Sequence, residues 1–259
     1  MDFARVTPAL DYIDANLAGD LSVGALARAS GLSHFEFHRR FRASVGESPR
    51  QYVRRLRLER AALWLNGSRR PVTEIAYAAG YATHESFTRA FKSRFGVPPL
   101  EFRAELPRAE RPRAGALSFE RLAPRTIAFA RHVGPYDRID DAFALVAAFL
   151  AERGLVAAEW LGIFHDDQRL TAAGRTRCHA AAVVPRGTGP CGAVEVRELA
   201  GGDHAVFSHS GSVAERRALY AQTYRSWLPA LGRRAAEMPP FEAFLGGGVT
   251  RVHVPLLPA

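Results

Sequence analysis

The 259-residue sequence predicts an all-α N-terminal domain followed by an α+β domain. Up to about residue 106, apolar residues recur three and four positions apart, which is the spacing of amphipathic helices. From Leu117 onward, short β-favouring runs separated by glycine and proline replace that pattern, and two helical segments, at about 137–153 and 213–231, interrupt them. We therefore place the first domain at residues 1–106, a polar, proline-containing linker at 107–116, and the second domain at 117–259.

The basic charge of the chain is concentrated in its N-terminal part. Residues 1–113 contain 19 Arg and Lys against 12 Asp and Glu, a net of +7, whereas residues 114–259 contain 16 against 14, a net of +2. A surplus of positive charge in one part of the chain predicts contact with a polyanion, because neutralising phosphates releases condensed counterions. An arginine-rich composition inherited from a GC-rich genome would explain why Lys92 is the single lysine, but it does not explain the asymmetry.

Several classes of protein do not fit the composition. No apolar run approaches the ~20 residues needed to cross a bilayer, and the first residues lack the charged and apolar regions of a secretory signal. Cys178 and Cys191 are thirteen positions apart, which is neither a disulfide framework nor a metal-binding spacing. We expect a cytoplasmic protein with no metal, no cofactor and no membrane association.

An internal repeat organises the N-terminal domain. The pattern Leu26-Ala27-x-Ala29-x-Gly31 recurs as Ile75-Ala76-x-Ala78-x-Gly80 with an offset of 49 residues, and the offset then becomes 50. The matched positions after the turn are His34/His84, Phe37/Phe87, Arg39/Arg89, Phe41/Phe91, Gly46/Gly96, Pro49/Pro99 and Tyr52/Phe102. Each copy consists of a short helix, a glycine-containing turn and a second helix, so the sequence predicts two helix-turn-helix units.

The second helix of each unit is expected to present a polar outer face. Phenylalanines four positions apart, Phe37 with Phe41 and Phe87 with Phe91, should face the core. The outer face then carries Phe35, His38, Arg39 and Arg42 in the first unit and His84, Glu85, Arg89 and Lys92 in the second. Arginine can donate to guanine, and an exposed aromatic ring can contact a thymine methyl group. Any single charge could be an ordinary solvated residue, but two copies of one basic face favour contact with DNA.

The region from about Leu21 to Arg103 resembles the DNA-binding domain of the AraC/XylS family of transcription regulators. The motif is Gly80-Tyr-Ala-Thr-His-Glu-Ser-Phe-Thr-Arg-Ala-Phe-Lys-Ser-Arg-Phe-Gly-Val-Pro-Pro-Leu-Glu-Phe-Arg103. The resemblance implies that a long helix, here about Pro49–Leu65, joins the units so that their second helices enter successive major grooves of promoter DNA, ~34 Å apart. It also implies RNA polymerase as a partner. The base-contacting places fall on Phe35, His38, Arg39, His84, Glu85 and Arg89.

Glu85 departs from the glutamine or basic residue often found at its place in that family. It would either accept a hydrogen bond from cytosine N4 or repel phosphate. Because the two reader helices therefore differ, we expect an asymmetric DNA site read by one chain. The i, i+4 pair His34 and His38 is interpreted as DNA-facing, since no carboxylate ligand accompanies it as in a metal site.

The C-terminal domain carries a fainter repeat. Ala130–Tyr136 and Phe207–Gly211 each end a strand-like run and open a helix, at an offset of 77 residues that Phe143 and Tyr220 maintain. The sequence therefore predicts a strand–helix–strand–strand unit used twice. Such internal symmetry would place a groove between the halves, which is a natural ligand site.

This domain resembles the GyrI-like small-molecule-binding domain of multidrug-sensing regulators, over nearly all of residues 117–259. The resemblance rests on His132-Val-Gly-Pro-Tyr136, Leu161-Gly-Ile-Phe-His-Asp-Asp167 and Pro240-Phe-Glu-Ala-Phe-Leu245. In that family a glutamate at the place of Glu242 contacts cationic ligands. The second repeat has Ser212-Val213 where the first has Pro-Tyr, so it lacks the corresponding ring.

Glu242 is the main candidate for ligand binding. In a strand through Phe241–Leu245, Glu242 and Phe244 point the same way, and a carboxylate beside an aromatic ring suits an organic cation. The expected effector-binding residues are Glu242, Phe244, Tyr136, Trp160, Phe164 and Tyr224. Most of these rings, each taken alone, would be ordinary core residues.

These features predict a transcription regulator that responds to a small lipophilic effector, for which Glu242 favours a cation. A coupling free energy of ~1–3 kcal/mol between effector and DNA would be sufficient. The alternative is a small-molecule hydrolase fused to a DNA-binding domain, with Glu242 as general base. We predict no enzymatic activity, because the sequence offers no nucleophile–base pair, metal spacing or phosphate loop. A third reading is a binding module whose N-terminal part contacts a polymerase subunit.

Overall fold

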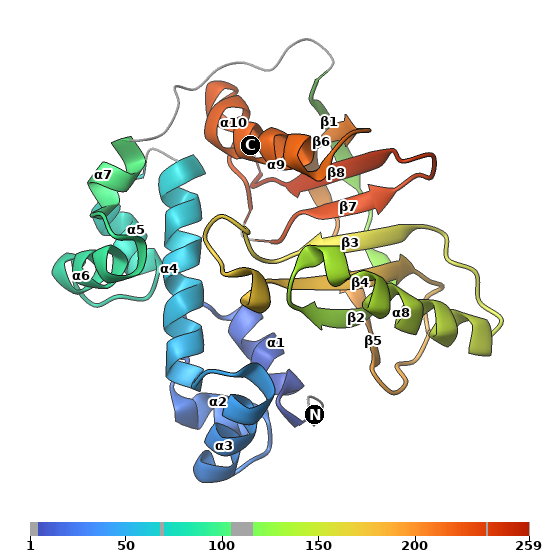
Figure 1. Ribbon diagram of the computed structural model, residues 1–259, viewed down its shortest axis with the longest axis horizontal. Helices are drawn as coiled ribbons and strands as arrows, with labels where there is room; N and C mark the ends of the chain where they lie inside the picture. Colours follow the sequence, from blue (N-terminus) through green and yellow to red (C-terminus); the bar gives the residue numbers. More distant parts are fainter. Residues whose placement is uncertain (1–4, 68–69, 105–115, 237, 259) are drawn as a thin grey trace. The chain divides into compact units, whose positions relative to one another are not determined.

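The structure is a computed structural model, and it describes residues 5–67, 70–104, 116–236 and 238–258 (Figure 1). The chain divides into two compact units, Met1–Leu106 and Pro107–Ala259. The expected linker at 107–116 lies, apart from Ala116, outside the described residues. None of the helices in the described ranges is long and apolar enough to cross a membrane.

The described part of the N-terminal unit is helical. Its helices are α1 (Thr7–Ala15), α2 (Val23–Ala29), α3 (His34–Val45), α4 (Pro49–Gly67), α5 (Val72–Ala78), α6 (His84–Phe95) and α7 (Pro99–Ala104). Helices α3 and α6 begin and end alike. The side chains of Ser33 and Thr83 accept hydrogen bonds from backbone N–H groups of their first turns, and Gly46 and Gly96 end the helices with positive φ of 82° and 86°.

Phenylalanines build the core around α3 and α6. Phe37, Phe41, Phe87 and Phe91 are all fully buried, as their spacing of four predicts. The first pair packs ring against ring and then onto Tyr52 of α4 at 5.4 Å. Equivalent residues of α3 and α6 therefore fix which face of each helix is turned outward.

The C-terminal unit contains an eight-stranded antiparallel sheet. Its strands are β1 (Ser118–Leu122), β2 (Arg125–Val133), β3 (Trp160–Phe164), β4 (Arg177–Val183), β5 (Val194–Leu199), β6 (Gly202–His209), β7 (Phe241–Phe244) and β8 (Thr250–Pro255), in the order β1-β6-β8-β7-β3-β4-β2-β5. The first half of the sheet runs β2, α8 (Asp140–Glu152), β3 and β4 along the chain. The second half runs β6, α9 (Val213–Gln222), β7 and β8, with a π-helical turn (Thr223–Trp227) and α10 (Leu228–Ala230) between α9 and β7.

The helices of this unit lie on one face of the sheet (Figure 1). Helix α8 packs on alanines of β2 and β4, where small side chains such as Ala128 and Ala180 allow close approach. Leu219 of α9 and Leu228 of α10 belong to a second apolar cluster with Phe207 and Val252. Each half of the sheet therefore has its own helical cover.

The sheet is curled because its connections are too short for a flat one. In the strand order, β1 and β2 are six steps apart, which is about 29 Å in a flat sheet. Only Ala123 and Pro124 join them along the chain, a connection that reaches at most about 11 Å. The two ends of the sheet must therefore meet, and they do so where the turn at Gly201 crosses Leu122–Pro124.

Curling explains why the face without helices is also buried. Its apolar cluster is Ile127, Phe129, Leu161, Ile163, Ala181, Phe241 and Ala243, all at most 2% exposed. Histidine rings extend this interior, since His179 stacks on Phe129 and His253 stacks on Phe241 at 4.6 Å. Burial lowers the pKa of both imidazoles, that of His253 to about 3, so they are neutral core rings at pH 7.

Candidate nucleic-acid interface and ligand site

The outer faces of α3 and α6 carry the side chains that the repeat singles out. Phe35 is 80% exposed, which is unusual for a phenylalanine, and His38, Arg39 and Arg42 are exposed beside it. On α6, Glu85, Arg89 and Lys92 are exposed and His84 is half-buried. Each helix therefore presents a basic surface opposite its buried phenylalanines.

Glu85 is held at the start of α6. Hydrogen bonds from its own backbone amide and from Thr83 lower the pKa of its carboxyl group, so it is ionised at neutral pH. Its negative charge stabilises the N-terminal turn of the helix. These bonds give Glu85 a local structural role that the motif alone did not indicate.

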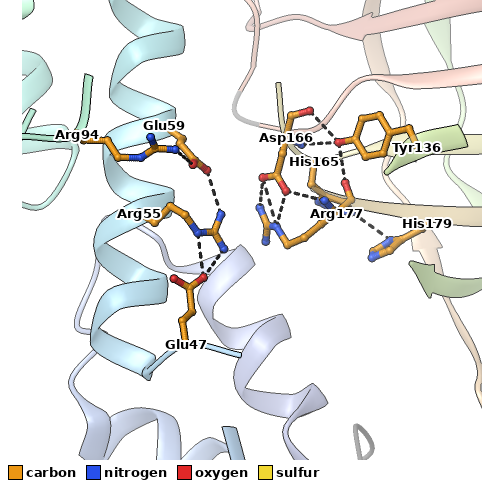
Figure 2. Close-up of polar contacts among 9 residues, drawn as sticks. All are labelled: Glu47, Arg55, Glu59, Arg94, Tyr136, His165, Asp166, Arg177 and His179. Carbon is orange, nitrogen blue, oxygen red and sulfur yellow. Dashed lines mark hydrogen bonds and ion pairs between the residues drawn. The ribbon is translucent and has the colours of Figure 1, made fainter. Parts of the chain in front are cut away.

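A chain of ion pairs joins α4 to α6 and to the segment that precedes α4 (Figure 2). Arg55 of α4 donates to Glu47 at 2.7 and 2.9 Å and to Glu59 at 3.1 Å, and Arg94 of α6 donates to Glu59 at 3.0 Å. Glu47, Arg55 and Glu59 are only 5–8% exposed. The sequence alone does not distinguish these residues, because charges four positions apart on a helix usually mark a solvated face.

Arg57 of α4 connects the segment before α2 with the turn between α5 and α6. Its guanidinium donates to the carbonyls of Leu17 at 3.0 Å, Gly19 at 2.7 Å and Gly80 at 3.3 Å. Gly80 has φ of +77°, and a Cβ there would lie 2.6 Å from the Arg57 guanidinium carbon. The turn between α5 and α6 therefore needs glycine for its backbone and for its contact with α4.

In the C-terminal unit, Glu242 is a buried carboxylate at the centre of the sheet. It lies on β7 directly opposite Gly162 of β3 and is 2% exposed. The Tyr220 hydroxyl donates to its Oε1 at 3.2 Å, and Nη1 of Arg216 lies 3.3 Å from its Oε2. Burial raises the pKa of Glu242, against the opposing effects of Arg216 and Tyr220.

Aromatic rings surround Gly162. Phe164 and Phe244 lie closest, within 2.9–3.3 Å of where a Cβ of Gly162 would stand. Trp160 is the cross-strand partner of Phe244, and both rings contact Phe143 of α8 at 5.7–5.8 Å. Because Gly162 has no side chain, the rings of Phe164 and Phe244 occupy the space beside Glu242.

Tyr136 contributes its ring to this group but not its hydroxyl. The ring lies 4.9 Å from that of Phe164. The hydroxyl donates to the carbonyls of Asp166 at 2.8 Å and Arg177 at 3.0 Å, and Asp166 also forms an ion pair with Arg177 (Figure 2). Burial raises the pKa of Tyr136, which keeps it a neutral donor. These bonds fix the ring in place.

Tyr224 follows Tyr220 by four residues, and the two hydroxyl groups interact electrostatically. Tyr224 packs with Phe207, Val252 and Leu228 in the apolar cluster of the second half, on the π-helical turn that follows α9. The structure therefore brings together Glu242, Phe244, Trp160, Phe164 and Tyr136, and Tyr224 lies in the apolar cluster that also contains Tyr220, the hydrogen-bond donor to Glu242. Within the described ranges, no three His, Cys, Asp or Glu side chains gather as a metal site would require.

Known families cover both units. A helix-turn-helix domain family matches residues 26–105, and the GyrI-like small molecule binding domain family matches residues 116–255, more than half of the chain. Multiple antibiotic resistance protein MarA of Escherichia coli (strain K12) is 32% identical over 102 residues, covering 39% of this chain and 80% of MarA. Regulatory protein SoxS of Salmonella typhimurium is 31% identical over 97 residues, covering 38% of this chain and 91% of SoxS.

Among solved structures, an AraC-type transcriptional regulator from Chromobacterium violaceum is 28% identical, with a TM-score of 0.38 over 40% of this chain and 92% of that one. The family matches and the two curated relatives agree with the basic N-terminal unit and the curled α+β unit described above. The chain belongs to the GyrI-like small molecule binding domain family and is an AraC/XylS-type DNA-binding transcription regulator.

Proposed function

We propose that α2–α3 and α5–α6 are two helix-turn-helix units whose second helices read successive major grooves of double-stranded promoter DNA. The exposed faces of α3 and α6 support this. Arg39 stands beside Phe35 and His38 on α3, and Arg89 stands with Lys92 on α6, so each face can contact base edges and phosphates. The ion pairs through Arg55 and the hydrogen bonds of Arg57 support the proposal further, because they hold both helix-turn-helix units on the same helix α4. The unequal faces favour an asymmetric site for one chain.

Removing Arg39 or Arg89 tests this proposal. The probe is a duplex selected from a random pool by the wild-type chain. We expect Arg39→Ala and Arg89→Ala each to weaken binding by about 1–3 kcal/mol, because each removes a guanidinium that contacts the DNA. Fluorescence anisotropy across a salt series measures both the affinity and the salt slope. Arg186→Ala, an equal charge change on an exposed loop of the other unit, should leave both unchanged.

A flat salt response, or full affinity in both reader-helix variants, would contradict DNA reading by these helices. Contact with RNA polymerase is part of the same proposal and follows from the family alone. We further propose that the two halves of the C-terminal sheet are structural repeats. Their equal succession of strand, helix, strand and strand supports this.

We infer that the effector site lies at Glu242, Gly162 and the surrounding rings, and that it takes a small lipophilic cation. One observation carries this inference: Glu242 is a buried carboxylate whose Oε2 has no hydrogen bond, and it stands beside aromatic rings. A buried carboxylate attracts a cation strongly, and aromatic faces add cation–π attraction. Effector binding would then bias DNA binding by the other unit.

Replacing Glu242 by glutamine keeps the shape of the site and removes its charge. We expect affinity for the aromatic cation 1-methylquinolinium to fall at least tenfold, about 1.4 kcal/mol, while affinity for its neutral isostere 1-methylnaphthalene stays the same. Equilibrium dialysis with the full chain measures both. If the cation binds Glu242→Gln as well as the wild type, Glu242 is not part of the site.

A further inference from the structure

Both oxygens of the Glu242 carboxylate face side chains of one helix. Arg216 approaches Oε2 and Tyr220 donates to Oε1. These two residues are four positions apart on α9, so they lie on the same helix face. The negative charge that makes this site attractive to a cation is thus already countered by a guanidinium of the same domain.

The pairing between Arg216 and Glu242 is incomplete. The atoms are close enough for Coulomb attraction, but Oε2 is buried without a hydrogen bond. By contrast, Asp166 in the same unit accepts hydrogen bonds from the backbone N–H and the guanidinium of Arg177 at 2.7–2.9 Å. A buried carboxylate that lacks a donor keeps part of its desolvation cost. Arg216 therefore balances the charge of Glu242 but leaves its Oε2 without a hydrogen bond.

Arg216 is also the outer member of the pair. Its side chain is 24% exposed, whereas that of Glu242 is 3% exposed. The guanidinium thus remains partly hydrated and can return to water at moderate cost, while the carboxylate cannot. Of the two charges, Arg216 is the one that can leave.

We propose that Arg216 is an internal counter-ion which a cationic effector displaces to reach Glu242, so that Arg216 sets the threshold for binding. The proposal rests on the effector function assigned to Glu242 above. A small hydrated cation gains only the charge interaction that Arg216 already makes, and it is rejected. An aromatic cation gains the same interaction plus contact with the rings of Phe244, Trp160 and Phe164, and it is accepted.

Removing the guanidinium tests the proposal on the full chain. In Arg216→Gln we expect 1-methylquinolinium to bind about tenfold more tightly, because the guanidinium no longer competes with the cation for Glu242. Binding of neutral 1-methylnaphthalene should not change. Arg186→Gln, the same substitution at an exposed arginine of the loop between β4 and β5, should behave as wild type toward both probes. In a Glu242→Gln background, the gain from Arg216→Gln should vanish, since the two residues act as a pair.

Unchanged or weaker binding of 1-methylquinolinium to Arg216→Gln, in a chain whose circular dichroism matches the wild type, overturns the proposal. If Arg216→Gln does not fold, Arg216→Lys decides: its shorter ammonium group is displaced more easily, so tighter binding supports the proposal and unchanged or weaker binding refutes it. The effector assignment itself fails by a different result, an unchanged cation affinity in Glu242→Gln. The two failures are therefore distinguishable.

Discussion

Replacement of Arg55 by methionine is expected to lower the free energy of unfolding of the N-terminal unit by about 3–5 kcal/mol. Arg55 is 8% exposed and bonds to two carboxylates that are buried as well, Glu47 and Glu59. Methionine fills a similar volume but removes the guanidinium that bonds to Glu47 at 2.7 and 2.9 Å. Arg94 still bonds to Glu59, so the greater part of the loss falls on Glu47.

Hydrogen exchange of the α4 amides measures this effect within the full chain. The matched control is Arg40→Met on α3, where the ion pair with Glu36 is 28% and 38% exposed. A surface pair of this kind contributes at most about 1 kcal/mol to stability, so hydrogen exchange of the α4 amides should hardly change in Arg40→Met. Adding Glu47→Gln and Glu59→Gln to Arg55→Met should restore much of the protection. Equal protection in wild type and Arg55→Met would show that the buried pairs contribute no net stability.

Gly201→Ala is expected to destabilise the C-terminal unit by about 3 kcal/mol. A Cβ at this position would collide with the Leu122 carbonyl and would lie 2.8 Å from backbone atoms of Ala123 and Pro124. No side-chain rotation can relieve a collision with backbone. The two turns would have to separate at the corner where the curled sheet closes, exposing Leu122 and Leu199, which pack on its interior.

Thermal unfolding followed by tryptophan fluorescence detects this loss, because two of the three tryptophans, Trp160 and Trp227, lie in the C-terminal unit. Gly174→Ala is the control, since a Cβ there meets nothing within 4 Å and the backbone needs no positive φ. It should unfold at the wild-type temperature. A Gly201→Ala chain with unchanged unfolding would mean that the turns can part freely, and that curling does not depend on this contact.

The predictable part of the structure was local. The period of the apolar residues predicted the buried faces of α3 and α6, because a helix shows its pattern within a few residues. The strand through Glu242 was predicted in the same way, with Glu242 and Phe244 on one face. The predicted helical segments at about 137–153 and 213–231 correspond to α8 and to α9 through α10.

The unpredicted part depends on distant pairings. Glu47, Arg55 and Glu59 carry the pattern of a solvated helix, and only the approach of α6 and the rest of the unit buries them. The pairing of Arg216 with Glu242 joins residues 26 positions apart across a helix and a strand. The curl of the sheet follows from strand order, which no single segment encodes. The strand pattern therefore predicted the sheet face on which Glu242 lies, but not the charge that accompanies it.

The pairing of the two edge strands of the sheet, β1 and β5, with their neighbours has a consequence for folding. Strand β1 precedes the first half along the chain but pairs with β6 of the second, so Ser118 meets Val206 across 88 residues, and β5 pairs back with β2. Strand pairs between distant segments, β1 with β6 and β3 with β7, join the two halves, which makes formation of the sheet a single cooperative event of high contact order. The helices of the N-terminal unit need only near neighbours. On the ribosome they can assemble early, while β1 waits for β6 to be synthesised.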